Sequence, residues 1–169
     1  MDFSEFDVFV TVTGFNHYII REPIVAGQRL LLMRETGNEY DKSAVAVYLS
    51  GEKIGYATDI GHITSDIREN LLGSNAVVIE SNHDLNMLKN GPYPAWLKMR
   101  IGSARGHLSN SDCAAFIPEL IASGTSDIML AHLSGENNTP DTALECAKCV
   151  CCENFHICVA KEREPTKLL

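Results

Sequence analysis

The C-terminal part of the chain holds a cluster of potential zinc ligands, Cys146-x-x-Cys149-x-Cys151-Cys152-x-x-x-His156-x-Cys158. Thiolates and an imidazole at such spacing can bind zinc tetrahedrally. Alternatively, the cysteines at 146, 149 and 152 lie close to one face of a predicted helix, where they would pack as small core residues. Five of the six cysteines crowd into this stretch, unlike a disulfide framework spread over a secreted domain. We therefore expect reduced thiols, with or without zinc.

Composition limits the functions that the chain could have. The 169 residues suffice for one domain or two small ones, and the hydrophobic fraction of 45% is ordinary for a globular protein. No apolar run reaches the roughly 18 residues that span a bilayer, and residues 1–5 lack the features of a signal peptide. We expect a cytoplasmic protein without a membrane partner. The formal net charge of −8 means that any contact with nucleic acid is local, at an end or through stacked bases.

The pattern of hydrophobic residues changes inside one predicted strand. Before it, strands are predicted at 6–15, 29–34, 44–49 and 53–57, which makes a β-meander. After it, helices are predicted at 64–72, 94–101, 109–122 and 139–152, and strands at 76–80, 127–131 and 156–160, which is an α/β layer pattern. The predicted fold class is α+β, with a β module over residues 1–56 and an α/β part over residues 57–169. The change within one strand indicates a fusion.

The first part resembles the HIRAN domain over residues 7–57. Three runs carry the resemblance: Val12-Thr13-Gly14-Phe15-Asn16-His17-Tyr18, Asn38-Glu39-Tyr40-Asp41-Lys42-Ser43-Ala44-Val45-Ala46-Val47 and Lys53-Ile54-Gly55-Tyr56. The resemblance implies binding of single-stranded DNA, at a free 3′ end. The implied binding residues are His17, Tyr18, Asn38, Tyr40, Asp41 and Lys42.

Within that implied site, Tyr18 and Tyr40 would stack on bases, each such contact contributing about 1–3 kcal/mol. The Asp41 carboxylate would accept a hydrogen bond from the terminal hydroxyl, and Lys42 would lie near a phosphate. The alternative interpretation is structural: both tyrosines would pack at strand ends and Asp41 would cap a turn. HIRAN domains continue with a helix and further strands, and without that continuation we expect an incomplete binding pocket.

The second part, residues 53–165, resembles the C-terminal half of metallo-β-lactamase-fold hydrolases of the WalJ/YycJ-like branch. The matching runs are Gly55-Tyr56-Ala57-Thr58-Asp59, Ile79-Glu80-Ser81-Asn82-His83-Asp84, Asn90-Gly91-Pro92-Tyr93-Pro94, Arg105-Gly106-His107-Leu108-Ser109-Asn110 and Leu130-Ala131-His132-Leu133-Ser134. The resemblance implies that Asp59 and His132 are metal ligands in a phosphodiesterase-type site. His107 and Ser109 precede a predicted helix, a place suited to phosphate contact or to support of the ligands. Asn82 and Asp84 follow a strand and would line the same cleft.

The family's His-x-His-x-Asp-His metal motif is absent from these 169 residues. Asp59 and His132 alone are too few ligands for a stable dinuclear site, so we expect zinc or manganese to be under-occupied. The structural alternative is that Asp59 caps a helix and His132 is an ordinary loop histidine.

Three functions follow from these patterns. The first is a protein that binds single-stranded DNA or another nucleic-acid end and carries a partial hydrolase. The second is a metal-dependent exonuclease whose site is completed by other residues, by a partner chain or by a second copy. The third is a recombined product without a selected function.

Overall fold

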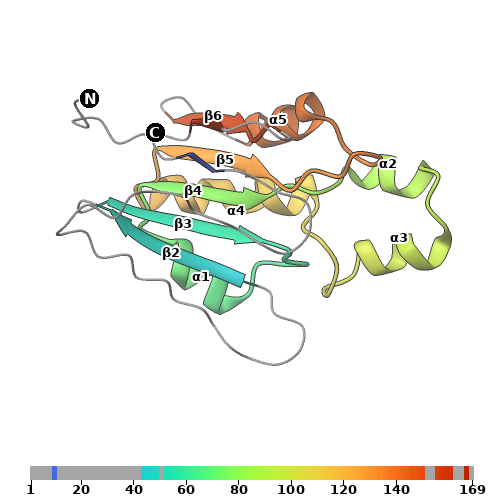
Figure 1. Ribbon diagram of the computed structural model, residues 1–169, viewed down its shortest axis with the longest axis horizontal. Helices are drawn as coiled ribbons and strands as arrows, with labels where there is room; N and C mark the ends of the chain where they lie inside the picture. Colours follow the sequence, from blue (N-terminus) through green and yellow to red (C-terminus); the bar gives the residue numbers. More distant parts are fainter. Residues whose placement is uncertain (1–8, 11–42, 50–51, 151–154, 162–165, 168–169) are drawn as a thin grey trace.

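The structure is a computed structural model that describes residues 9–10, 43–49, 52–150, 155–161 and 166–167 (Figure 1). Most of the first two predicted strands, and all six predicted DNA-binding residues before Ser43, lie outside this part of the chain. At its two ends, β1 (Phe9–Val10) pairs antiparallel with β7 (Thr166–Lys167). Among the described helices, none combines the length and the apolar character needed to cross a membrane.

One five-stranded sheet organises the described residues, in the order β2-β3-β4-β5-β6. The strands are β2 (Ser43–Leu49), β3 (Glu52–Thr58), β4 (Ala76–Glu80), β5 (Asp127–Ala131) and β6 (His156–Val159). β2 pairs antiparallel with β3, and the other neighbours are parallel. All five were predicted from sequence to within a few residues. The predicted division after residue 56 falls inside β3, which pairs with β2 on one side and with β4 on the other.

Five helices accompany the sheet: α1 (Ser65–Leu71), α2 (Leu85–Asn90), α3 (Ala95–Ile101), α4 (Asn110–Ala122) and α5 (Pro140–Lys148). Thr64, Ser109 and Thr139 cap three of them by accepting a hydrogen bond from a backbone N–H, as the sequence indicates. The expected end of the last helix at residue 152 was wrong, because α5 ends at Lys148. α2 was not predicted. It has only six residues and is followed directly by glycine and proline.

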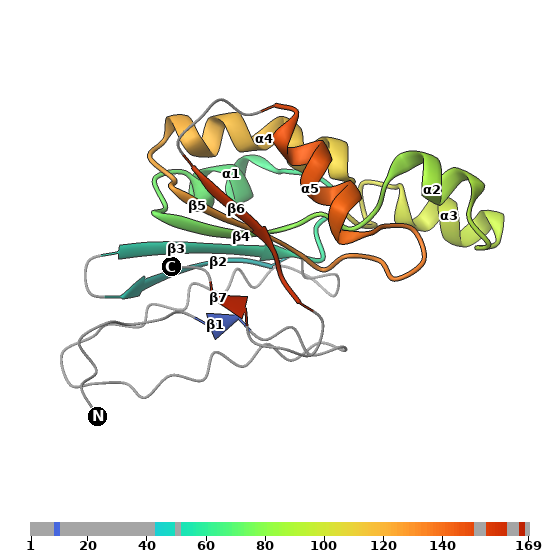
Figure 2. The ribbon, with the colours of Figure 1, turned by 90° about the horizontal axis from the view of Figure 1, so that it is seen from above.

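The sheet carries a buried hydrophobic cluster on each of its two faces. α1, α4 and α5 cover one face (Figure 2), and alternate residues of β4 such as Val77 and Ile79 pack there against Phe116 and Leu120 of α4. The opposite face of β4 and β5 presents a second buried cluster that includes Val78. All five residues of β4 are buried, as expected of a central parallel strand covered on both faces.

The three central strands also set the position of the candidate site. β3, β4 and β5 are parallel and therefore end at the same edge of the sheet. The residues directly after β3 and β5 are Asp59 and His132, and β4 itself ends at Glu80. Ligands of α/β proteins commonly bind at this carboxyl edge.

Candidate metal centre

Asp59 and His132 have an unusual backbone. Their φ angles are 58° and 57°, and they are the only non-glycine residues with positive φ in the described chain. This left-handed conformation is rare for residues with a Cβ, although Asp and His adopt it more readily than most, and such strain gathers at functional sites. It turns both side chains toward each other at the strand ends. His132 Nε2 lies 3.7 Å from Asp59 Oδ1.

Glu80 lies beneath these residues and is fully buried. Its Oε1 is 2.8 Å from Nδ1 of His107 and 2.6 Å from Nδ1 of His132. Its Oε2 accepts backbone hydrogen bonds from Ile60 at 2.7 Å and Leu108 at 3.2 Å. A carboxylate can only accept, so both histidines donate from Nδ1. In the neutral rings the lone pair is then on Nε2, the nitrogen that remains available to bind a metal.

The electrostatics follow from the same contacts. Burial by itself raises the pKa of Glu80, but hydrogen bonds from His107 and His132, together with their charges, outweigh burial and lower that pKa. Burial lowers the pKa of His132, and the hydrogen bond to Glu80 with the charges of Glu80 and Asp59 raises it above its ordinary value. Glu80 is therefore ionised in the folded protein at neutral pH, as its role as a fourfold acceptor requires.

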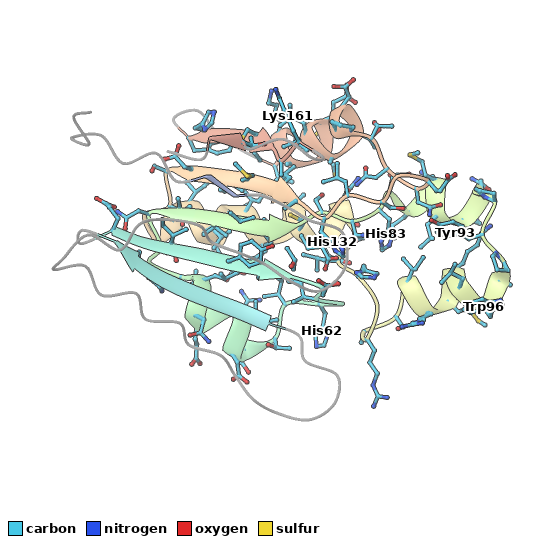
Figure 3. All side chains as sticks on the ribbon, in the orientation of Figure 1. His62, His83, Tyr93, Trp96, His132 and Lys161 are labelled. Carbon is cyan, nitrogen blue, oxygen red and sulfur yellow. The ribbon has the colours of Figure 1, made fainter. Side chains whose placement is uncertain are left out.

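Asp59, His107 and His132 together form a candidate metal site. One ligand atom from each can be chosen so that all three lie within 4.8 Å of one another. The rings of His107 and His132 are tilted, with centroids 5.1 Å apart, and Figure 3 shows His132 at the carboxyl edge of the sheet. Two imidazole nitrogens and a carboxylate oxygen suit zinc or manganese. This donor set, braced by a buried carboxylate, fits a divalent metal ion.

The sequence predicted Asp59 and His132 as ligands but gave His107 only a supporting or phosphate-contacting role. The structure places His107 in the same group of potential ligands as the other two. A signal for this was present in the sequence: Glu80 ends a strand predicted to be buried, and a buried glutamate needs several donors. Its donors turned out to be the two histidines and two backbone amides.

The other predicted site residues lie next to the centre and have structural contacts. Asn82 donates from Nδ2 to the backbone oxygen of His132 at 2.7 Å and so helps to hold the left-handed residue. Ser109 is the N-cap of α4 and Asp84 the N-cap of α2. The roles predicted for these three residues, as phosphate contacts or as support for the ligands, stay predictions.

A buried amide network below the loops was not predicted. Asn138 donates from Nδ2 to the backbone oxygens of Ser81 at 2.8 Å and Asn82 at 3.1 Å. Asn110 accepts from the Ser81 hydroxyl at 2.7 Å. Buried polar groups of this kind are stable only when they are satisfied, and once satisfied they fix one arrangement. The network holds together the segments that follow β4 and β5 and precede α4 and α5.

The cysteine cluster gains no support from the part of the chain that is described. Cys113 is buried, Cys146 and Cys158 are half-buried, and Cys149 is exposed as the C-cap of α5. The group of three or more potential ligands found in the described residues contains no cysteine. Cys151 and Cys152 lie outside the described residues, so the zinc hypothesis for this cluster stays a prediction.

The chain is similar to known proteins in two parts. The HIRAN domain model matches residues 5–84. The C-terminal half is similar to proteins named exodeoxyribonucleases. The YycJ protein of Bacillus anthracis is 40% identical over 98 residues, which is 58% of this chain and 37% of that relative. The WalJ proteins of Streptococcus pneumoniae strains D39 and R6 are 38% identical over 86 residues, 51% of this chain and 32% of each relative. Both resemblances are confirmed.

The candidate site is divided between the two matched regions. The HIRAN match runs past residue 57 to residue 84, so it includes β3, α1 and β4. Asp59 and Glu80 lie inside this HIRAN-matched region, whereas His107 and His132 lie beyond it. The chain spans about a third of the length of the exodeoxyribonucleases that it matches.

Proposed function

We propose that this chain binds a divalent metal ion through Asp59, His107 and His132, and that this centre acts on a phosphodiester of a single-stranded DNA end held by the HIRAN region. In this proposal the α/β part is one half of a metallo-β-lactamase-type fold. The HIRAN match and the similarity to exodeoxyribonucleases support a DNA substrate. Because the relatives are much longer than the matched segment, their activity is carried over only as part of the proposal.

The observation that carries the proposal is the arrangement around Glu80. One buried carboxylate accepts from Nδ1 of both His107 and His132, which leaves both Nε2 atoms for a shared ligand beside Asp59. Glu80 fixes this tautomer in both rings, and the pairing of two such rings beside the Asp59 carboxylate is what favours a metal ion over a purely structural role. A metal-binding histidine is usually supported in this way, by donating its other ring N–H to a carboxylate.

A bound divalent ion would supply charge stabilisation at a phosphate oxygen and lower the pKa of water. The residues of the chain would hold and orient the ion. Asp59 contributes a negative charge, Glu80 orients the two rings, and Asn82 holds the backbone of His132. His107 has two candidate roles: as a third ligand, or as a phosphate contact next to a site made by the other two residues.

We expect about one zinc or manganese per chain, measured by elemental analysis of protein purified without a chelator or an affinity tag. Asp59→Asn should lower metal affinity by more than the roughly 10- to 100-fold typical of losing a supporting residue. Asparagine tolerates the left-handed backbone of residue 59, which limits the effect to the lost charge. Cleavage of an end-labelled single-stranded oligonucleotide in Mn²⁺ or Zn²⁺ should disappear in the same variant.

Asp141→Asn, at an exposed position in the first turn of α5, is the matched control and should keep metal and cleavage. His107→Ala separates the two roles of that residue: lost metal identifies a ligand, and retained metal with weaker DNA binding identifies a phosphate contact. Metal content unchanged by Asp59→Asn would contradict the proposed centre. Cleavage unchanged by it would reveal a contaminating nuclease.

A second candidate function is binding of a DNA end without hydrolysis. The HIRAN match favours it, as does the lack of a His-x-His-x-Asp-His motif in these residues. Here Asp41→Asn should abolish the preference for a free 3′-hydroxyl over a 3′-phosphate, and Tyr40→Ala should weaken binding about 5- to 150-fold through lost stacking. Fluorescence anisotropy with the two oligonucleotides measures both. Parent-like affinity and end preference in both variants would remove the HIRAN region from the proposal.

A further inference from the structure

Two short helices project from the carboxyl edge of the sheet. α2 and α3, with the residues that connect and follow them, make a segment that we call the arm, residues 85–106. Figure 1 shows α2 and α3 beyond the end of the sheet, apart from the helices that cover its face. Lys98 of α3 donates from Nζ to the backbone oxygen of Lys89 in α2 at 2.9 Å, which ties the two helices together.

The charge of the arm is opposite to that of the whole chain. From residue 85 to residue 111 there are four basic residues and no acidic one, whereas the chain as a whole has a formal net charge of −8. The four are Lys89, Lys98, Arg100 and Arg105. A positive segment on a negative protein attracts a polyanion locally, without the overall positive field that binding along a duplex needs.

The arm also exposes large apolar side chains. Trp96 is 62% exposed, Met99 71% and Leu85 55%, and these are three of the four large exposed hydrophobic residues in the described chain. Figure 3 shows Trp96 and Tyr93 together on the part of the arm that lies away from the sheet. Exposed aromatic rings among basic side chains are the combination that binds single-stranded nucleic acid, because bases stack on the rings while phosphates meet the charges.

Both ends of the arm are fixed at the candidate metal centre. The arm starts directly after Asp84, which is itself four residues after Glu80. Its last residue, Gly106, comes directly before His107. The backbone N–H of His107 donates to the backbone oxygen of Ile101, the last residue of α3, at 2.9 Å. A single strand of nucleic acid bound along the arm would therefore lead toward Asp59, His107 and His132.

We propose that the arm binds single-stranded nucleic acid and delivers the strand to the metal centre, with a base stacked on Trp96 and phosphates near Lys89 and Arg100. This inference rests on the proposed function for its direction and on the arm's own surface for its chemistry. A second copy of the chain is the less suitable occupant, because two arms meeting symmetrically would bring like charges together.

Trp96 is the chain's single tryptophan, so its fluorescence reports directly on the arm. We expect quenching when the full chain is titrated with a phosphorothioate-linked single-stranded oligonucleotide, which resists cleavage. By anisotropy, Trp96→Ala should weaken binding roughly 5- to 150-fold, while Trp96→Phe should restore most of the affinity because phenylalanine still stacks. Lys89→Gln with Arg100→Gln should reduce the slope of log affinity against log salt by about 1.4. Lys148→Gln, exposed at the end of α5, is the matched control.

The inference fails if the oligonucleotide binds while Trp96 fluorescence and the affinity of Trp96→Ala stay unchanged. It fails equally if the parent binds no strand. It also fails if Trp96→Ala alters only the sedimentation of the protein, which would identify a second copy as the occupant, or if only anionic lipid vesicles change the fluorescence. Metal content separates this inference from the proposed function. If the chain holds no metal but its Trp96 fluorescence is still quenched, nucleic-acid binding by the arm is supported and the metal centre is not.

Discussion

Glu80→Gln is expected to lower metal affinity about 10- to 100-fold and the free energy of unfolding by about 2–4 kcal/mol. The substitution keeps the size of the side chain and removes its charge. It acts on a fully buried group that accepts from four donors: Nδ1 of His107, Nδ1 of His132, and the backbone amides of Ile60 and Leu108. Isothermal titration with Zn²⁺ or Mn²⁺ and chemical denaturation in chelator measure the two effects.

Neither orientation of the new amide can satisfy all of these donors. If its NH₂ group faces His107 and His132, each ring must accept at Nδ1 and carry its proton on Nε2, which removes it as a ligand. If the NH₂ group faces Ile60 and Leu108 instead, two backbone N–H groups lose their acceptor at a buried site. The first orientation removes the ligand nitrogens and the second leaves backbone donors unsatisfied. In both, charge-assisted hydrogen bonds become weaker bonds to a neutral amide, so metal affinity and stability fall in either case.

The pH dependence of the metal-free protein has a defined sign. The pKa of Glu80 is lowered from its ordinary 4.5, so its contribution is complete above pH 4.5 and is lost as pH falls through the lowered pKa. The pKa of His132 is raised from its ordinary 6.5, so its contribution is complete below pH 6.5 and is lost as pH rises through the raised pKa. In chelator, the stability advantage of the parent over Glu80→Gln should therefore be largest between these two values.

Glu145→Gln is the matched control, because that side chain is exposed on α5. It should stay within about 0.5 kcal/mol of the parent at every pH. Equal stability and equal metal affinity of Glu80→Gln and Glu145→Gln would contradict the role of Glu80 in orienting His107 and His132.

The sequence predicted the layers of this fold better than its site. Local signals carry the layers: the apolar run Val77–Ile79 predicts a buried strand, and Thr64 and Thr139 mark helix starts. The site depends on contacts between distant segments. The bonds from Glu80 to His107 and to His132 join residues 27 and 52 positions apart, and no local pattern specifies which nitrogen of a ring will be free. The family resemblance supplied Asp59 and His132, and the fold was needed to add His107.

The arm illustrates the same limit. Its second helix, α3, was predicted, whereas α2, with six residues, is too short for a periodic pattern to be read from the sequence. Nothing in the local sequence distinguishes an exposed tryptophan at position 96 from a core tryptophan. The charge of residues 85–111 was visible in the sequence, but its meaning depends on where the fold places that segment relative to the centre.

Gly106→Ala is expected to lower the free energy of unfolding by about 3 kcal/mol and to impair metal binding with it. A Cβ at this buried position would lie against the backbone oxygens of Ile101 and Arg100, well inside the 3.0 Å that real Cβ atoms essentially never cross. Those oxygens belong to the last turn of α3 and cannot rotate away as a flexible side chain could. The loop must move, and the next residue in it is His107.

Gly135→Ala is the control for this change, because a Cβ there meets nothing within 4 Å. It should leave stability and metal content near those of the parent. Thermal denaturation with and without added metal separates the two effects of Gly106→Ala. If the loop shifts as a rigid unit, Gly106→Ala should have a lower melting temperature than the parent both with and without metal. The increase in melting temperature on adding metal should also be smaller, because His107 no longer reaches Glu80. A variant as stable as the parent, with the same gain from metal, would mean that the turn before His107 relaxes without moving the ring, and that the close fit at residue 106 does not position the site.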